Sequence, residues 1–169
     1  MKRLLGIVWT VAILSLSCAD AATIVETAQQ DGNFKKLLSA SKSVGVDKAL
    51  QGKGPFTLFA PDDAAFEKVP ATKLQALMNP NNLEKLKTVL GSHLVTGVLT
   101  LEDIEGGLTT NDGAMVATVN NMPLVFKREN GTITVNGARF RKAPIRVENG
   151  LIYIIDTVLV PPMPLQPKY

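Results

Sequence analysis

The sequence has 169 residues, a formal net charge of +3, one histidine and one cysteine. A single cysteine excludes an intramolecular disulfide, and the small net charge excludes a strongly basic or acidic protein whose partner could be inferred from charge alone. For this length we expect one domain, with enough chain to bury a core without covalent cross-links.

The amino terminus has the pattern of a secretory leader. Lys2 and Arg3 precede a mostly apolar run without charge, Leu4–Leu16, which is too short for a good membrane span. The small residues of Ala19-Asp20-Ala21 stand where a signal peptidase reads the chain. We therefore predict a signal peptide over residues 1–21 and a mature protein that is secreted, either periplasmic or extracellular.

Cys18 offers an alternative for the same leader, as the lipidated first residue of a lipoprotein. Against this, Leu16 stands one position away from the leucine that such a processing site usually has. We favour cleavage after residue 21, which also removes the only cysteine and leaves a mature chain that can form no disulfide.

Helical patterns fill most of the chain from Thr23 to Gly91. Apolar residues recur there at spacings of three and four, and turn residues separate the segments. We expect Asn33 to cap the second helix. The predicted helices span residues 23–30, the segment that follows Asn33, and residues 46–50, 72–78 and 83–90.

An apolar run from Phe56 to Phe59 interrupts the helices and ends at Pro61. The run suits a strand that is buried on both faces, and Pro61 cannot donate a ladder hydrogen bond. Asp62 can then accept a hydrogen bond at the start of the next helix, and Asp63 adds negative charge near the positive end of that helix. We interpret the two carboxylates as capping residues rather than as acid–base groups.

Turn dipeptides rich in Asn and Gly follow Leu108 at spacings of roughly ten residues. Between them we predict short antiparallel strands at residues 115–119, 123–127, 132–135, 138–141, 145–148 and 151–155, after one helical turn at 101–105. The strand at 151–155 is apolar on both faces and should be central. Helices first and strands after predict an α+β domain over residues 22–162, with a Pro-rich extended tail at 163–169.

Two stretches resemble the signature motifs of the fasciclin (FAS1) family, Phe56–Phe66 and Asn149–Pro162, and they occur in the order of that family. The residues that carry the resemblance are Phe59, Pro61, Asp62, Asp63 and Phe66 in the first motif, and Asn149, Gly150 and Asp156 in the last, which also contains Tyr153. The resemblance implies a compact wedge of antiparallel β-strands flanked by short helices. It also implies a secreted or surface location, as in single-domain bacterial members.

The chain departs from the family pattern at two positions. In the middle motif of the family a tyrosine often precedes the histidine, and that pair is linked to integrin-type adhesion; here Ser92 precedes His93. The last motif often has a histidine where this chain has Tyr153. The resemblance therefore implies the fold, whereas adhesion through a tyrosine–histidine pair is not expected.

His93 is the residue that most invites a catalytic role. Ser92, His93 and a carboxylate would make a nucleophilic triad, but neighbouring side chains of an extended segment point to opposite faces and no Gly-x-Ser-x-Gly elbow is present. We expect His93 to be a partly buried residue that ties its segment to the Asp62–Asp63 corner. With one histidine and one cysteine in the whole chain, we expect no catalytic, metal or cofactor site.

A group of cations stands out in the strand-rich half, opposed by Glu129 and Glu148. The cations, which we call the basic ribbon, are Lys127, Arg128, Arg139, Arg141, Lys142 and Arg146. By alternation, Arg139 and Arg141 share one strand face and Phe140 takes the other. Such a ribbon suits an anionic glycan or a phosphorylated surface polymer. The alternative is a solvated face that discourages edge-to-edge aggregation.

These features predict a secreted, non-enzymatic interaction or adhesion module of the cell envelope or extracellular matrix, whose partner is a surface protein or an anionic glycan. The alternative is a periplasmic carrier that holds a small apolar ligand in the wedge. We expect no nucleic-acid partner and no membrane span after cleavage. An enzyme ranks last because the sequence lacks a convincing catalytic constellation.

Overall fold

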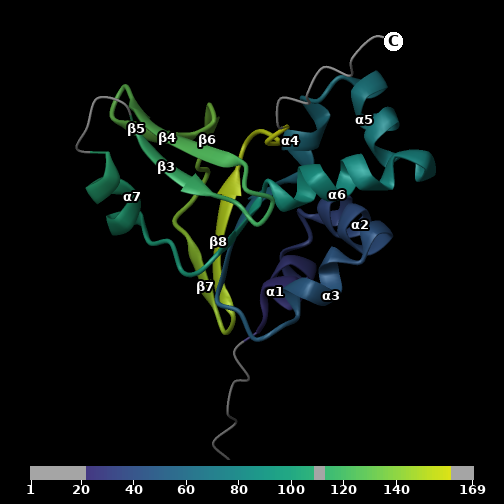
Figure 1. Ribbon diagram of the computed structural model, residues 1–169, viewed down its shortest axis with the longest axis horizontal. Coiled ribbons are helices and arrows are strands. Elements are labelled where there is room, and N and C mark those ends of the chain that lie inside the picture. The colour runs from purple at the N-terminus through teal and green to yellow at the C-terminus, as the bar shows by residue number, and fades with distance from the viewer. Residues whose placement is uncertain (1–21, 109–112, 161–169) are drawn as a thin grey trace, which may run out of the picture.

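Residues 22–108 and 113–160 are described by the structure, a computed structural model shown in Figure 1. The helices are α1 (Ile24–Asp31), α2 (Lys35–Val44), α3 (Val46–Leu50), α4 (Asp63–Glu67), α5 (Ala71–Met78), η1 (Pro80–Asn82), α6 (Leu83–Gly91) and α7 (Leu101–Gly107). The strands are β1 (Phe56–Pro61), β2 (Leu94–Thr96), β3 (Ala114–Ala117), β4 (Pro123–Glu129), β5 (Thr132–Val135), β6 (Ala138–Arg139), β7 (Ile145–Val147) and β8 (Gly150–Ile155). Among the described helices only α7 follows β2, which confirms the predicted α+β class.

The strands form two four-stranded sheets. Sheet A has the order β2-β1-β8-β7, and sheet B has the order β3-β4-β5-β6. Every pair in sheet B is antiparallel, as predicted. In sheet A the central strands β1 and β8 run parallel, from Phe56 opposite Gly150 to Pro61 opposite Ile155. This pair departs from a purely antiparallel wedge, because the long connection between β1 and β8 lets the two strands meet in the same direction.

One bent segment joins the two sheets. β6 lies at the edge of sheet B, and the chain then crosses to sheet A, where Phe140 forms a bridge with Ile155. The Arg141 N–H donates to the Ile154 carbonyl oxygen at 2.9 Å before the chain continues into β7. The strand predicted at 138–141 therefore ends in sheet B at Arg139, because its last residues pair with β8 instead.

The alternating side chains of β8 divide the interior into two cores. Ile152 and Ile154 pack against the helices that cover one face of sheet A. Leu151, Tyr153 and Ile155 point to the other face and pack between the two sheets. The ring centroids of Phe59 and Tyr153 lie 5.3 Å apart in the core between the sheets, next to Phe126. β8 is thus apolar on both faces because it separates two hydrophobic layers. In Figure 1 the strand lies between the N-terminal helices and sheet B.

Several predicted bounds agree closely with the structure, and one element is longer. α3 and β5 have the predicted ends. The single turn predicted at 101–105 is the longer α7, which begins with a capping box between Thr100 and Asp103. The predicted signal peptide at 1–21, which includes Cys18, and the predicted tail at 163–169 lie outside the described residues.

Candidate functional site

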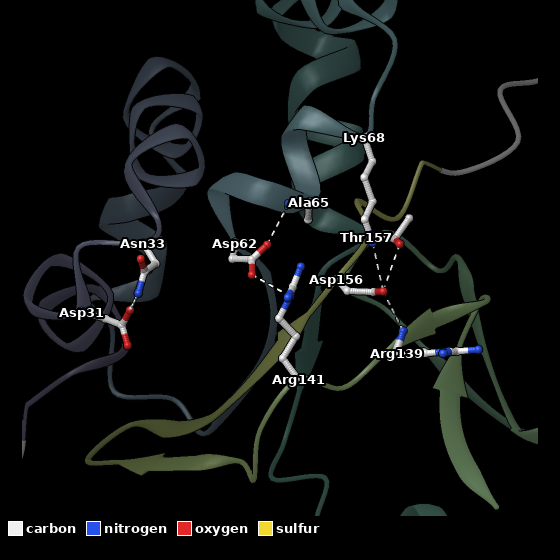
Figure 2. A network of polar contacts seen from close by, with 9 residues as sticks. All are labelled: Asp31, Asn33, Asp62, Ala65, Lys68, Arg139, Arg141, Asp156 and Thr157. Atoms are coloured by element: carbon white, nitrogen blue, oxygen red, sulfur yellow. Dashed lines mark hydrogen bonds and ion pairs between the residues drawn. The ribbon is translucent and has the colours of Figure 1, made fainter. Parts of the chain in front are cut away.

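The corner between β1 and α4 is held by Asp62. One carboxylate oxygen, Oδ1, accepts the Ala65 N–H at 2.7 Å and so caps α4. The other, Oδ2, lies 2.7 Å from Nε of Arg141, on the segment that joins the sheets (Figure 2). Asp62 therefore acts in two places, because one oxygen caps α4 and the other contacts the segment that joins the two sheets.

Asp63 caps a helix that lies far from it in sequence. Its Oδ1 accepts the Lys36 N–H at 2.9 Å, in the first turn of α2. Asn33, the predicted cap of α2, does not serve this purpose, because α2 begins after Phe34 and no side chain caps it locally. The Asn33 amide instead donates to Asp31 at 2.5 Å. A carboxylate from another element has replaced the expected local cap.

Asp156 ties the end of β8 to β6. Its Oδ1 accepts the Arg139 N–H at 2.9 Å, and its backbone N–H donates to the Arg139 carbonyl oxygen at 3.1 Å. Its Oδ2 lies 3.1 Å from Nζ of Lys68. Burial acts to raise the pKa of Asp156, but the hydrogen bonds from Arg139, Lys68 and Thr157 outweigh it and hold the pKa below its usual value. In Figure 2 the Arg139 side chain extends away from this network.

His93 is fully buried, with 1% of its surface exposed, rather than partly buried as predicted. Nδ1 lies 2.7 Å from the Val89 carbonyl oxygen, and Nε2 accepts the Leu159 N–H at 2.9 Å. The predicted tie to the Asp62–Asp63 corner is wrong, since both ring nitrogens bond elsewhere. Burial lowers the pKa of His93 to about 4, against the opposing effect of the Val89 hydrogen bond. A carbonyl oxygen can only accept, so the neutral ring carries its proton on Nδ1.

Ser92 is not hydrogen-bonded to His93, although the reason differs from the predicted alternation. Ser92 is the C-cap residue of α6 and not part of an extended segment. Its hydroxyl donates to the Thr88 carbonyl oxygen at 2.9 Å. The two side chains that could suggest a nucleophile and its base thus serve the end of one helix.

Asn149 and Gly150 of the last motif serve the backbone. The buried Asn149 amide accepts the Ile24 N–H at 3.0 Å and donates to the carbonyl oxygens of Leu50 and Gly52 at 2.7 and 3.1 Å. At Gly150, with φ +155°, a Cβ would lie 1.8 Å from the Phe56 carbonyl oxygen, so no side chain fits. These two residues let the start of β8 pass closely between α1, α3 and β1.

The aromatic and proline residues of the two motifs belong to the cores. Phe59, Pro61, Phe66 and Tyr153 are all buried. The Tyr153 hydroxyl donates to the Leu99 carbonyl oxygen at 2.8 Å. Burial, together with the charge of Asp103, raises the pKa of Tyr153 to about 12. The motif residues therefore build the wedge and do not form an exposed recognition surface.

The basic ribbon is divided among several faces. Lys127 and Arg139 both lie opposite Thr134 in the register of sheet B, so the three share its outer face. Arg128, one residue later, lies 3.7 Å from Glu105 of α7. The other three cations lie beyond sheet B: Arg141 pairs with Asp62, Lys142 follows it, and Arg146 is on the edge strand β7. Sequence spacing could not reveal this division, because it depends on where the chain changes sheets.

Within the described ranges, no three His, Cys, Asp or Glu side chains gather in a way that could hold a metal ion. The helices of the same ranges are all too short or too polar to cross a bilayer. The polar groups of the two motifs bond to helix ends and backbone groups, and Lys127 and Arg139 are two exposed cations on the outer face of sheet B.

Comparison with known proteins agrees with this architecture. The chain is 37% identical over 153 residues to Protein sll1483 of Synechocystis sp.. The matched region covers 90% of this chain and 81% of that protein. It is 32% identical over 119 residues to the cell surface glycolipoprotein MPB83 of Mycobacterium bovis, covering 70% of this chain and 49% of that one.

The fold is similar to that of a solved FAS1 domain pair from the insect cell adhesion molecule fasciclin I, with a TM-score of 0.72 at 19% identity, over 82% of this chain and 50% of that one. The family model described as Fasciclin domain matches residues 32–161. This chain therefore belongs to the fasciclin domain family.

Proposed function

We propose that this protein is a secreted, non-enzymatic interaction module that acts in adhesion at the cell envelope or in an extracellular matrix. Membership of the fasciclin family supports the proposal most directly. One relative is a cell surface glycolipoprotein, and the similar solved structure belongs to a cell adhesion molecule. The leader pattern over residues 1–21 supports export.

The burial of His93 supports a role without catalysis. A general base needs a nitrogen within reach of a substrate proton, and a metal ligand needs a free lone pair. Here Nδ1 faces the Val89 carbonyl oxygen, Nε2 accepts the Leu159 N–H, and the ring is shielded from solvent. The only histidine of the chain is thus committed to holding the fold together.

The outer face of sheet B is the surface that we assign to an anionic partner. Lys127 and Arg139 flank Thr134 on neighbouring strands, so their Cα atoms are separated by two strand spacings, about 10 Å. Both residues are exposed. Two cations on a rigid sheet can contact successive anionic groups of an extended polymer, such as a sulfated or phosphorylated glycan. Arg128 and Arg141 are less suited, because they do not share this outer face: Arg128 lies near Glu105 of α7 and Arg141 lies beside Asp62.

Retention on a dextran sulfate column tests this surface. Lys127→Glu combined with Arg139→Glu should elute at clearly lower salt than the unaltered protein, because the polymer contacts are reversed in sign. The matched control is Lys85→Glu with Lys87→Glu, which makes the same change in net charge on α6. If both pairs shift elution equally, retention follows net charge alone and this surface is not a binding site.

The carrier alternative has less support from the structure. Two apolar cavities in the helical half, of about 20 and 10 Å³, both border Leu37, Leu90 and His93. Each has room for about one water molecule, so an organic ligand would have to displace core side chains. Native mass spectrometry of the purified protein checks this: a co-purifying small molecule would favour the carrier over the adhesion module.

A further inference from the structure

The edge strand β3 carries an unused row of backbone groups. β3 has only one neighbour in sheet B, β4. Its residues Ala114, Met115, Val116 and Ala117 carry no charge, and the sequence has no charged residue from Gly113 to Phe126. Natural sheets usually protect an edge with a charge, a proline or a bulge. β3 has none of these three devices; it is short, with four residues, so its edge can accept only a short strand.

The hydrogen bonds next to β3 show which of its groups point outward. The Thr118 N–H donates to the Met122 carbonyl oxygen, so Thr118 faces β4, and the Val119 N–H donates away from β4, to the Leu94 carbonyl oxygen. Because the direction alternates along a strand, Met115 and Ala117 share the outward direction of Val119. Val125, which lies opposite Met115, agrees with this, since its N–H and carbonyl bond toward β5.

The outward groups of Met115 and Ala117 have no hydrogen-bond partner among the described residues. α7 does not cover them. Its Ile104 packs in the core between the sheets, and its Gly107 lies against Ala114, whose side chain faces that same core. Met115 projects to the other side of the sheet, where 68% of its surface is exposed. Among the described residues, the outward groups of Met115 and Ala117 are thus open and the Met115 side chain beside them is exposed, whereas the next outward N–H, at Val119, already bonds to Leu94 of β2. A partner strand can therefore pair with this edge at Met115 and Ala117 only.

We infer that β3 pairs antiparallel with β3 of a second copy of this chain, centred on Val116, to give one continuous sheet across a two-fold axis. In this register Met115 of each copy lies opposite Ala117 of the other, and each such pair exchanges two backbone hydrogen bonds. All outward groups of both residues are then satisfied. The large Met115 side chain meets the small Ala117 on the outer face, and Val116 meets Val116 on the other face.

A second copy suits this edge better than a charged peptide does. The neutral run from Gly113 to Phe126 offers no ion pair to a charged strand, whereas an identical neutral edge brings no repulsion. Closed two-fold pairing is also the commonest arrangement of identical subunits. The contact is short, so we expect a weak dimer that forms at high local concentration. This inference does not depend on the proposed function.

Sedimentation equilibrium tests the pairing. The weight-average mass of the full chain should rise toward twice the monomer mass between about 10 µM and about 1 mM. Ala117→Pro removes an N–H that points outward, and it leaves the hydrogen bonds between β3 and β4 in place. Met115→Lys places a positive charge on the edge of both copies. Each substitution should weaken dimerisation at least about tenfold. Met78→Lys, at an exposed methionine on α5, is the control and should dimerise like the unaltered chain.

Cysteine cross-linking tests the register without relying on loss of association. In a Cys18→Ser background, a Met115→Cys protein mixed with an Ala117→Cys protein should form a disulfide-linked pair, because directly opposite residues lie about 5.5 Å apart at Cα. Neither protein alone should cross-link efficiently. A chain that stays monomeric at about 1 mM, or a mixture that links no better than either protein alone, would overturn the inference.

Discussion

Leu159 donates its backbone N–H to Nε2 of His93 across 2.9 Å, and this bond fastens the segment after β8 to the end of α6. The bond requires a neutral ring, since a protonated Nε2 is itself a donor. His93 also holds the Val89 carbonyl oxygen through Nδ1. A single buried imidazole therefore joins two elements that are far apart in sequence.

Acidification should destabilise the protein through His93. Its pKa is about 4 in the folded protein against an ordinary value of 6.5, so the unfolded chain binds the proton more readily. The stability is fully present above pH 6.5 and falls as the pH drops toward 4, by about 3 kcal/mol. Urea unfolding at pH 7.0, 6.0, 5.0 and 4.0 measures this loss. His93→Gln, which removes the only histidine, should flatten the dependence; an equally steep decline in this variant would assign it to carboxylates instead.

The Asp62–Arg141 contact should contribute less than the helix cap made by the same carboxylate. Asp62→Ala removes both and should cost about 1–2 kcal/mol, mostly from the cap. Arg141→Gln removes only the ion pair with its half-exposed guanidinium and should cost less than about 1 kcal/mol. A double-mutant cycle by urea denaturation separates the two effects. The exposed Arg128–Glu105 pair serves as reference, and its cycle should give a coupling near zero.

Asn149→Ala should be strongly destabilising. The change leaves the Ile24 N–H and the carbonyl oxygens of Leu50 and Gly52 without this partner in a buried place, which costs about 2–3 kcal/mol. Asn82→Ala is the matched control, because its amide makes one exposed bond and the expected cost is below about 1 kcal/mol. Equal losses in thermal unfolding would contradict the assignment of Asn149 as a buried anchor.

Gly150→Ala should disrupt β8, because the added Cβ would collide with the Phe56 carbonyl oxygen in the neighbouring strand. We expect a loss of more than about 3 kcal/mol, or no folded protein. Gly32→Ala is the comparison, since Gly32 also has a positive φ but a Cβ added there would meet no atom within 4 Å, and it should cost about 1 kcal/mol. Circular dichroism melting curves distinguish the two, and a mild effect at Gly150 would show that β1 and β8 can separate.

Much of the fold follows from neighbours along the chain. Pro61 ends β1, Asp62 caps α4 within three residues, and Asn–Asn and Asn–Gly turns separate the strands of sheet B. These features depend on local backbone geometry, helix periodicity and strand alternation, which a sequence displays directly. The two motifs also indicate the family, and the family implies the wedge-shaped fold.

Contacts between distant elements were settled only by the tertiary structure. Asp63 caps a helix 27 residues away in place of Asn33, and His93 bonds Leu159 across 66 residues rather than the corner at Asp62. The basic ribbon is dispersed for the same reason, since the chain leaves sheet B after β6, just before Arg141. Such pairings depend on which strands lie side by side. The apolar runs indicate that β1 and β8 are buried on both faces, but they do not show that the two strands are neighbours that run parallel.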